Sequence, residues 1–343
     1  MSPGGKPLLD VLAGKTRTPP PIWLMRQAGR YLPEYREVRA RQPDFIAFCL
    51  NPQAAAEVTL QPIRRYGFDA SIVFADILLI PHALGQKVWF EKGEGPKLEP
   101  LAPKDAGRLQ PDRVEERLEP VCETLRILRR ELPGDCTLIG FAGAPWTVAT
   151  YMIEGGGSKD RWAARTAAWS DPAGFDALMA VLADATARYL IAQARAGAEV
   201  LKLFESWAEG LPAPLFERVV IAPTRTIVDQ VRAAGVEAPI IGFPKGAGPL
   251  AVRYARETGI DALAIDHGLD TGWATGALPA GLPVQGQRDP AVLKAGGAAL
   301  DGEVDRLLAA WKDRPYVFNL GHGINPDVPP DHVTRLVNRV RGL

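Results

Sequence analysis

The sequence predicts a single domain, residues 1–343, folded as a distorted (β/α)8 barrel of the TIM type. Three observations predict this fold: eight short runs rich in Ile, Val, Leu and Phe, helical patterns between several of them, and polar residues directly after the runs. Short apolar runs of this kind are typical of parallel strands buried on both faces. They are residues 21–24, 71–74, 138–141, 200–204, 239–242, 262–265, 282–285 and 316–320.

The stretches between the runs are amphipathic, and Gly or Pro follows several of them, as is common at helix ends. We expect helices over residues 175–196, 215–234, 249–258 and 301–312. Residues 86–103 follow the second run and carry Gly93, Gly95 and Pro96 between two apolar pieces. We expect a hairpin there, or an ordinary surface loop.

The composition excludes several classes of protein. Hydrophobic residues make up 47% and charged residues 23%, which is typical of a globular fold and not of a disordered chain. Forty basic and forty acidic residues give no net charge, so we expect no nucleic-acid or membrane partner. Three scattered cysteines and the lack of a signal-like or membrane-spanning apolar stretch favour a cytoplasmic protein.

Polar residues follow the predicted strands, and these positions carry the functional prediction. The C-terminal ends of barrel strands converge on one face, where TIM-barrel enzymes keep their active sites. Polar residues far apart in the sequence are therefore expected to line one cleft, although loops are polar in general. They include Arg26, Gln27, Asp76, Ser206, Lys245, His267, Gln287 and His322. For Lys245 a contact at the edge of the cleft and simple solvation are both open.

Five arginines lie between Arg26 and Arg41. Guanidinium groups grip carboxylates with two parallel hydrogen bonds, so this cluster favours a polycarboxylate ligand. Arg26 and Arg30 are the better candidates because they flank Gly29 directly after a strand. The remaining arginines fit solvated helix faces.

Asp76 is a carboxylate with apolar neighbours on both sides. Burial would raise its pKa unless N–H donors or a cation face it, so we expect a partner. A functional acid, a helix N-cap and a structural ion pair are all open readings.

Several long motifs occur along the chain. The first is PIWLMRQAGRYLPEY at 21–35 and the second is GFAGAPWT at 140–147. They resemble the two signatures of the uroporphyrinogen decarboxylase family. The similarity continues through 57–62, 74–78, 151–158, 203–206 and 319–324, and so covers nearly the whole chain.

This resemblance implies a homodimeric barrel enzyme of haem and related tetrapyrrole synthesis. It would convert the acetate groups of uroporphyrinogen to methyl groups, giving coproporphyrinogen, without a metal or organic cofactor. Carboxylate contacts are implied for the two arginines and His322, contact with the pyrrole nitrogens for Asp76, and further contacts for Tyr151, Phe204 and Ser206. The substrate-binding residues that it implies are Arg26, Gln27, Ala28, Gly29, Arg30, Asp76, Tyr151, Phe204, Ser206 and His322.

The chemistry of the implied reaction needs an electron sink. Protonation of the ring carbon beside the acetate makes the pyrrole a cationic iminium, so the substrate supplies what a cofactor supplies elsewhere. We hypothesise that Asp76 stabilises this cation and that Arg26 helps to deliver the proton, with Tyr151 as the third catalytic residue. A bound water or the substrate's own carboxyl group is an alternative proton donor, since arginine is a poor acid.

Two other functions fit the same frame. One is a zinc- and corrinoid-linked methyltransferase of the same barrel superfamily, which would need a His and Cys ligand cluster. The other is a tetrapyrrole binder without catalysis, which would need the arginines but not Asp76. The chain departs from the usual family pattern at Trp207, at His267 and at Gln287-Arg288, which we expect at the edge of the cleft.

Overall fold

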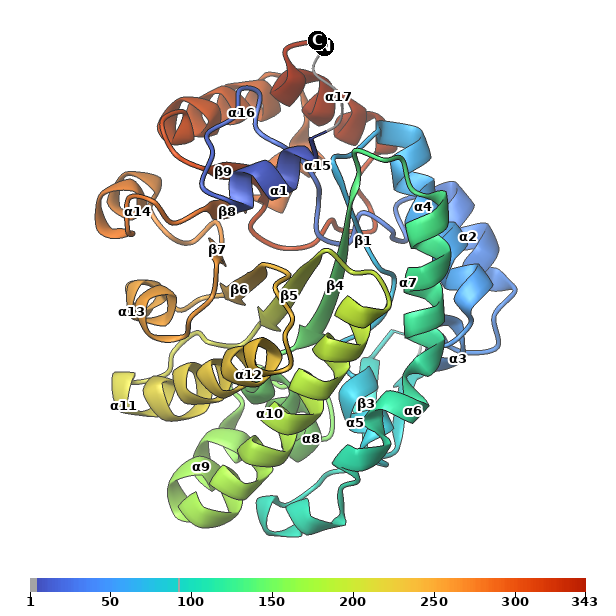
Figure 1. The fold of residues 1–343 in the computed structure, drawn as a ribbon, viewed down its shortest axis with the longest axis vertical. Helices are drawn as coiled ribbons and strands as arrows, with labels where there is room; N and C mark the ends of the chain where they lie inside the picture. Colours follow the sequence, from blue (N-terminus) through green and yellow to red (C-terminus); the bar gives the residue numbers. More distant parts are fainter. Residues whose placement is uncertain (1–4, 92) are drawn as a thin grey trace.

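The computed structural model describes residues 5–91 and 93–343, and its central feature is a curled parallel sheet (Figure 1). Seven strands are hydrogen-bonded in the order β1, β4, β5, β6, β7, β8, β9, and each pair of neighbours is parallel. Their bounds are β1 Ala70–Ile72, β4 Thr137–Gly143, β5 Val200–Glu205, β6 Ile240–Pro244, β7 Ala262–Ala264, β8 Val284–Arg288 and β9 Tyr316–Leu320. These are the last seven of the eight predicted strands.

The remaining predicted strand, residues 21–24, joins the two edges of the sheet. Ile22 forms a parallel bridge with Phe318 of β9, and the Phe318 N–H donates to the Pro21 carbonyl at 2.9 Å. On its other side the Ile22 carbonyl accepts from the Asp69 N–H at 3.0 Å, and the Ile22 N–H donates to the Asp69 carboxylate at 2.8 Å. A side chain thus takes the place of a backbone partner at this seam. The predicted distorted (β/α)8 barrel is confirmed, with the distortion at its first strand.

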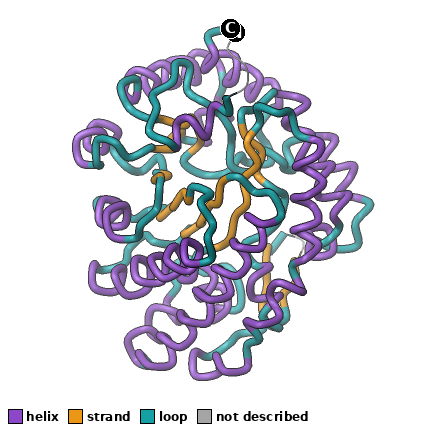
Figure 2. The backbone as a smooth tube through the Cα atoms, in the orientation of Figure 1, coloured by secondary structure: helices purple, strands orange, loops and turns teal. Residues whose placement is uncertain are grey.

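The helices surround the strands, which lie at the centre of the molecule (Figure 2). The sheet is therefore covered on its outer face, as parallel sheets require. No helix in the described part of the chain is both long and apolar enough to span a membrane. The helices are α1 Pro7–Leu12, α2 Pro33–Ala40, α3 Phe45–Cys49, α4 Pro52–Tyr66, α5 Leu79–Ala83, α6 Val114–Arg117, α7 Glu119–Glu131, α8 Pro145–Glu154, α9 Trp162–Ser170, α10 Pro172–Arg195, α11 Ala213–Phe216, α12 Ala222–Ala233, α13 Leu250–Glu257, α14 Thr271–Ala277, α15 Pro290–Ala295, α16 Gly297–Trp311 and α17 Pro330–Arg341, with 3-10 turns η1 Pro103–Arg108 and η2 Pro111–Arg113.

One predicted helix is divided. The stretch 215–234 consists of α11, a π-helical turn η3 (Glu217–Ile221) and α12. Pro223 stands just inside α12 and has no N–H for the regular helical ladder, and a π turn is one of the ways in which a helix absorbs such a break. The other three predicted helices are present, as α10, α13 and α16.

Alternate residues of β5 face opposite sides, as the pleat of a strand requires. Lys202 and Phe204 meet the ring of Phe243 inside the barrel, whereas Glu205 bonds to Thr147 of the surrounding helix α8. A strand of this kind carries one set of residues to the interior and another to the helix layer. Its end therefore delivers side chains to the mouth of the barrel.

The expected hairpin is present as β2 Val88–Glu91 and β3 Gly95–Leu98, paired antiparallel. It also contacts the glycine-rich turn after α8. The Leu98 N–H donates to the Gly155 carbonyl at 3.0 Å, and Lys97 bridges to Gly156. Gly155 has a φ of 76° at the C-cap of α8, a conformation that glycine adopts without strain. The glycines thus end a helix and pair with the hairpin.

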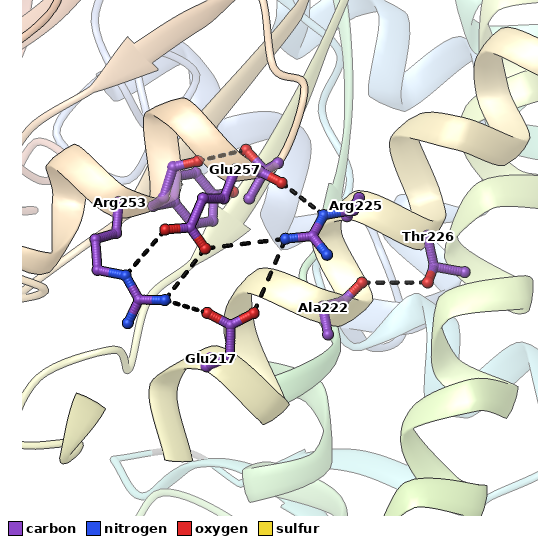
Figure 3. A network of polar contacts seen from close by, with 8 residues as sticks. Glu217, Ala222, Arg225, Thr226, Arg253 and Glu257 are labelled. Atoms are coloured by element: carbon purple, nitrogen blue, oxygen red, sulfur yellow. Dashed lines mark hydrogen bonds and ion pairs between the residues drawn. The ribbon is translucent and has the colours of Figure 1, made fainter. Parts of the chain in front are cut away.

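Ion pairs and hydrogen bonds tie η3, α12 and α13 together on the outside of the barrel (Figure 3). Arg253 of α13 donates to Glu257 of the same helix at 3.0 Å and bonds to Glu217 of η3. Arg225 of α12 donates to the Glu257 carbonyl at 2.7 Å. This network lies on the outside of the barrel and contains none of the predicted site residues.

Candidate active site

The predicted site residues come from loops that follow different strands of one closed barrel. Arg26 follows residues 21–24, which join the two edges of the sheet. Asp76 follows β1, Tyr151 lies on α8 after β4, Ser206 follows β5, and His322 follows β9. Since the strands are parallel, all of these loops leave the same end of the barrel.

Arg26 occupies a tight, fixed turn. Its φ of 62° is in the left-handed region, which costs a residue other than glycine about 1–2 kcal/mol. The turn is held on both sides: the Met25 N–H donates to the Asn319 side chain at 3.0 Å, and the Ile324 N–H donates to the Met25 carbonyl at 2.9 Å. Backbone strain that is maintained by such anchors is typical of functional sites.

The side chain of Gln27 points away from the site. Its amide oxygen accepts from the Leu24 N–H at 3.0 Å, its amide nitrogen donates to the Ala70 carbonyl at 3.1 Å, and the residue is fully buried. Gln27 therefore fixes the turn to β1. The half-buried Ala28 and Gly29 follow it, and Arg30 is exposed. Gly29 tolerates no side chain, because a Cβ would overlap the Arg26 carbonyl.

The Arg26 side chain lies over the loop that carries His322. A Cβ on Gly323 would overlap the Cδ of Arg26, and a Cβ on Gly321 would overlap the His267 backbone. Burial, with Arg26, Lys245 and His267 nearby, lowers the pKa of His322 to about 4 against a smaller opposing effect of Asp266. His322 is thus neutral at pH 7 and offers hydrogen bonds without a charge.

Asp76 lies half-buried between β1 and α5. Its Oδ1 accepts from the Leu78 N–H at 2.8 Å, while Oδ2 makes no hydrogen bond with the described residues. Burial raises the pKa of Asp76 to about 6, outweighing the Leu78 N–H and the positive charge of Arg26. The predicted partner is therefore a backbone N–H and a nearby arginine, without a direct salt bridge.

Tyr151 is close enough to Asp76 and Arg26 for both charges to act on it. Burial is the larger cause of its raised pKa, Asp76 adds to the rise, and Arg26 opposes it. The Tyr151 ring lies 6.2 Å from the ring of Trp207, centroid to centroid. The three predicted catalytic residues thus share one region.

The end of β5 supplies an aromatic surface and a positioned serine. The Phe204 ring meets Phe141 at 5.4 Å and Phe243 at 6.1 Å, both edge to face. The Ser206 N–H donates to the Thr147 hydroxyl oxygen at 2.7 Å, and that hydroxyl donates to Glu205. Burial raises the pKa of Glu205 to about 8, so it is protonated at pH 7 and serves as a neutral support.

Sequence reasoning missed Lys202, which lies beneath this aromatic surface. Its Nζ is 5.2 Å from the Phe204 ring centroid, 5.3 Å from that of Phe243 and 5.6 Å from that of Trp23. The residue is fully buried, and burial lowers its pKa well below the usual value. A single lysine in the apolar run of β5 was the available signal.

The departures from the family pattern lie in different places. Arg288 is buried and donates to Glu303 of α16 at 3.1 Å, so it faces the helix layer and not the cleft. Gln287 donates to the Asp266 carbonyl at 3.3 Å and supports the loop after β7. Trp207 and His267, by contrast, lie beside Tyr151 and His322.

No group of three or more His, Cys, Asp or Glu side chains lies in a metal-binding arrangement within residues 5–91 and 93–343. The three cysteines, Cys49, Cys122 and Cys136, are free and buried. Burial raises the pKa of each thiol, which keeps the thiols protonated at neutral pH.

Comparisons with known proteins point to one family. A family model described as uroporphyrinogen decarboxylase (URO-D) matches residues 4–343. The chain is 66% identical to a uroporphyrinogen decarboxylase of Maricaulis maris over 98% of this chain and 97% of that one, and 53% identical to one of Sphingopyxis alaskensis over the full length of both. Among solved structures, a methyltransferase from Methanosarcina mazei aligns over 98% of this chain and 97% of that chain, with a TM-score of 0.76 and 17% identity. That last similarity concerns the fold alone.

Proposed function

This chain belongs to the uroporphyrinogen decarboxylase family, and we propose that it removes the acetate carboxyl groups of uroporphyrinogen as carbon dioxide. The product is coproporphyrinogen, in which methyl groups replace the acetates, and the pathway is haem biosynthesis. The observation that carries the proposal is the placement of Asp76, Arg26 and Tyr151 in one region, in a chain 66% identical to a named decarboxylase.

In the proposed mechanism the ring carbon beside the acetate is protonated first, which turns the pyrrole into a cationic iminium. The bond to the carboxyl carbon then breaks, its electron pair neutralises the ring, and carbon dioxide leaves. Protonation of the exocyclic methylene carbon completes the methyl group, and loss of the proton first added to the ring carbon restores the neutral aromatic pyrrole. The substrate is thus its own electron sink, and the protein supplies position and charge.

Asp76 is proposed to bind the pyrrole N–H groups and to stabilise the cation. Its Oδ2 is the oxygen left without a partner in the described chain, and with a pKa of about 6 it is ionised at neutral pH. A carboxylate about 4 Å from the cation contributes about 4 kcal/mol at an effective dielectric constant of 20. Enzymes typically lower barriers by about 8–23 kcal/mol, so positioning must supply the rest.

Positioning is assigned to the other site residues. Arg26 and Arg30 are proposed to grip carboxylates, His322 to hydrogen-bond one as a neutral donor, and Tyr151 and Ser206 to hydrogen-bond the substrate. Phe204 is proposed to pack against the macrocycle, and the backbone from Gln27 to Gly29 to line it. Arg26, whose positive charge acts on Asp76, is also proposed to help deliver the ring proton.

The proposal also covers assembly and location. We propose a homodimer, as the family resemblance implies, acting in the cytoplasm, where free thiols such as Cys49 persist. We further propose that residues 1–343 act as a single domain without a metal or organic cofactor.

The test is incubation of the purified protein with uroporphyrinogen in the absence of oxygen. The expected result is stepwise loss of four carboxyl groups per molecule, as measured by mass spectrometry of the oxidised products. Treatment with a chelator should leave the rates of decarboxylation unchanged. Substrate that binds but keeps all eight carboxyl groups would contradict decarboxylation and favour a binder. Loss of activity on chelation would contradict the cofactor-free mechanism.

A further inference from the structure

The half-buried indole of Trp207 lies among two cations and a site tyrosine. The Arg161 guanidinium carbon is 3.9 Å from the Trp207 ring centroid, and the Lys245 Nζ is 5.8 Å from it. The Tyr151 ring, part of the proposed active site, is 6.2 Å away. A cation over an indole face is attracted to the ring, so Trp207 holds two positive charges beside Tyr151.

Arg161 is held in place with binding capacity left over. Its φ of 48° is in the left-handed region, its N–H donates to the Ser158 hydroxyl at 3.0 Å, and the residue is only 7% exposed. One guanidinium nitrogen, Nη1, donates to the exposed Glu209 at 3.1 Å. The buried Nε has no partner among the described residues. An arginine has five donors, and this one uses few of them.

Lys245 is fixed by its backbone between neighbouring strands. Its N–H donates to the Glu205 carbonyl at 2.9 Å, and the next N–H, that of Gly246, donates to the Asp266 carboxylate at 2.7 Å. Gly246 has a φ of 79°, and a Cβ there would overlap Glu209. The loop after β6 therefore has a single close-packed path, and it brings Lys245 to Trp207.

Lys245 leaves the barrel opposite the strand that precedes the predicted arginines, and Arg161 leaves it a quarter of the way round. With residues 21–24 closing the sheet, the order around the barrel is 21–24, β1, β4, β5, β6, β7, β8, β9. Arg26 and Arg30 follow the first position of this ring. Lys245 follows β6, four positions later, which is diametrically opposite. Arg161 follows α8, in the loop after β4.

We propose that Arg161 and Lys245, spaced by Trp207, form a second carboxylate-binding cluster, for carboxylates of the macrocycle that Arg26 and Arg30 do not bind. The proposal rests on the proposed function, because uroporphyrinogen carries an acetate and a propionate on each of four rings and so presents carboxylates around its whole perimeter. His322 supplies no charge at pH 7.

The test compares steady-state kinetics of Arg161→Met and Lys245→Met with the wild type on uroporphyrinogen. Each variant loses a charged hydrogen bond to the substrate, so KM is expected to rise about tenfold. The kcat should stay within about twofold, because the carboxylates bound by this cluster are not the ones that react in that turnover. Arg161→Lys keeps the charge and is expected to recover part of the lost affinity. Arg253→Met, in the outer network, is the matched control and leaves KM unchanged.

Glu209→Gln separates binding from a merely structural ion pair. Glu209 competes with the substrate for Arg161, so its neutralisation is expected to lower KM severalfold, whereas a structural role would leave KM unchanged or raise it. Unchanged KM in Arg161→Met and Lys245→Met, with wild-type decarboxylation intact, would overturn this inference alone. Absence of decarboxylation in the wild type would instead overturn the proposed function.

Discussion

At the scale of single residues, the backbone of Arg26 is the least expected feature of the site. Arginine gains nothing from a left-handed conformation, yet the turn holds it there through Met25 and Gln27. The strained backbone conformation fixes the direction in which the Arg26 side chain projects, as a binding role would require. Sequence reasoning selected Arg26 from its place after a strand, and could not foresee its φ because no turn signal other than Gly29 is present.

A pair of substitutions separates the strain from the charge. Arg26→Gly and Arg26→Ala both remove the guanidinium and should both abolish most activity. Only glycine relieves the left-handed backbone, so Arg26→Gly should be more stable than Arg26→Ala by about 1 kcal/mol in urea unfolding. Equal stabilities would mean that the turn relaxes once the side chain is absent.

Asp76 determines the expected pH dependence. Its ionised form is required by the proposed mechanism, and its pKa is raised to about 6. We predict that kcat/KM falls about tenfold per pH unit below a midpoint near pH 6. His322, with a pKa of about 4, adds no limb between pH 5 and 8. A flat profile of kcat/KM from pH 7 to 5 would contradict the assignment of Asp76.

At the scale of elements, β5 and α8 act as one unit that positions Ser206. The chain of hydrogen bonds runs from the Ser206 N–H to Thr147 and on to the protonated Glu205. A neutral carboxyl group can be buried here at lower cost than a charged one. This explains a buried glutamate next to the cleft that takes no part in the proposed chemistry.

Glu205→Gln tests this support. The folded-state pKa of about 8 lies above the unfolded value of 4.5, so between these values the folded protein holds more protons and its stability falls as the pH rises. Relative to Glu205→Gln, the wild type should lose about 1.4 kcal/mol of unfolding free energy per pH unit between pH 5 and 8. Activity should persist in the variant, because the amide still accepts from Thr147. A difference in stability that is independent of pH would show that Glu205 titrates normally.

The elements themselves were largely predictable, and the exceptions have physical reasons. The predicted strands were right because parallel strands buried on both faces leave continuous apolar runs. The run at 21–24 gave no hint that the Asp69 side chain would replace a backbone partner. The predicted helix over 215–234 is divided at Pro223, and the spacing of apolar residues used to predict the helix does not take a proline into account. Lys202 and Arg161 were missed because their roles depend on rings contributed by distant strands and loops.

At the scale of the whole molecule, closure of the barrel makes the site. Arg26 and His322 are nearly 300 positions apart in sequence, yet the seam at Ile22 and Phe318 places their loops side by side. The convergence of polar residues after the strands could be predicted from the fold class. The different positions of Trp207, which lies beside Tyr151, and Arg288, which faces a helix, could not be predicted, because strand ends do not reveal which face a side chain takes.

The single domain, the homodimer and the roles of individual residues stay predictions at this scale. The proposed roles of the residues rest on one physical idea, that a carboxylate positioned at the mouth of the barrel stabilises a positive charge generated on the substrate. The ionised state of Asp76 is costly to the fold, because its folded-state pKa lies above the usual 3.8. Loss of that charge should therefore harm the reaction without harming the fold.

The most direct test is the kcat of Asp76→Asn on uroporphyrinogen at pH 7, measured together with its unfolding free energy. Asparagine keeps the oxygen that accepts from Leu78 and removes the charge. We predict that kcat falls at least about a hundredfold, as expected for loss of about 3 kcal/mol of transition-state stabilisation, while stability is equal or higher. A variant that keeps most of the wild-type kcat would contradict the proposal that the Asp76 carboxylate stabilises a cationic pyrrole.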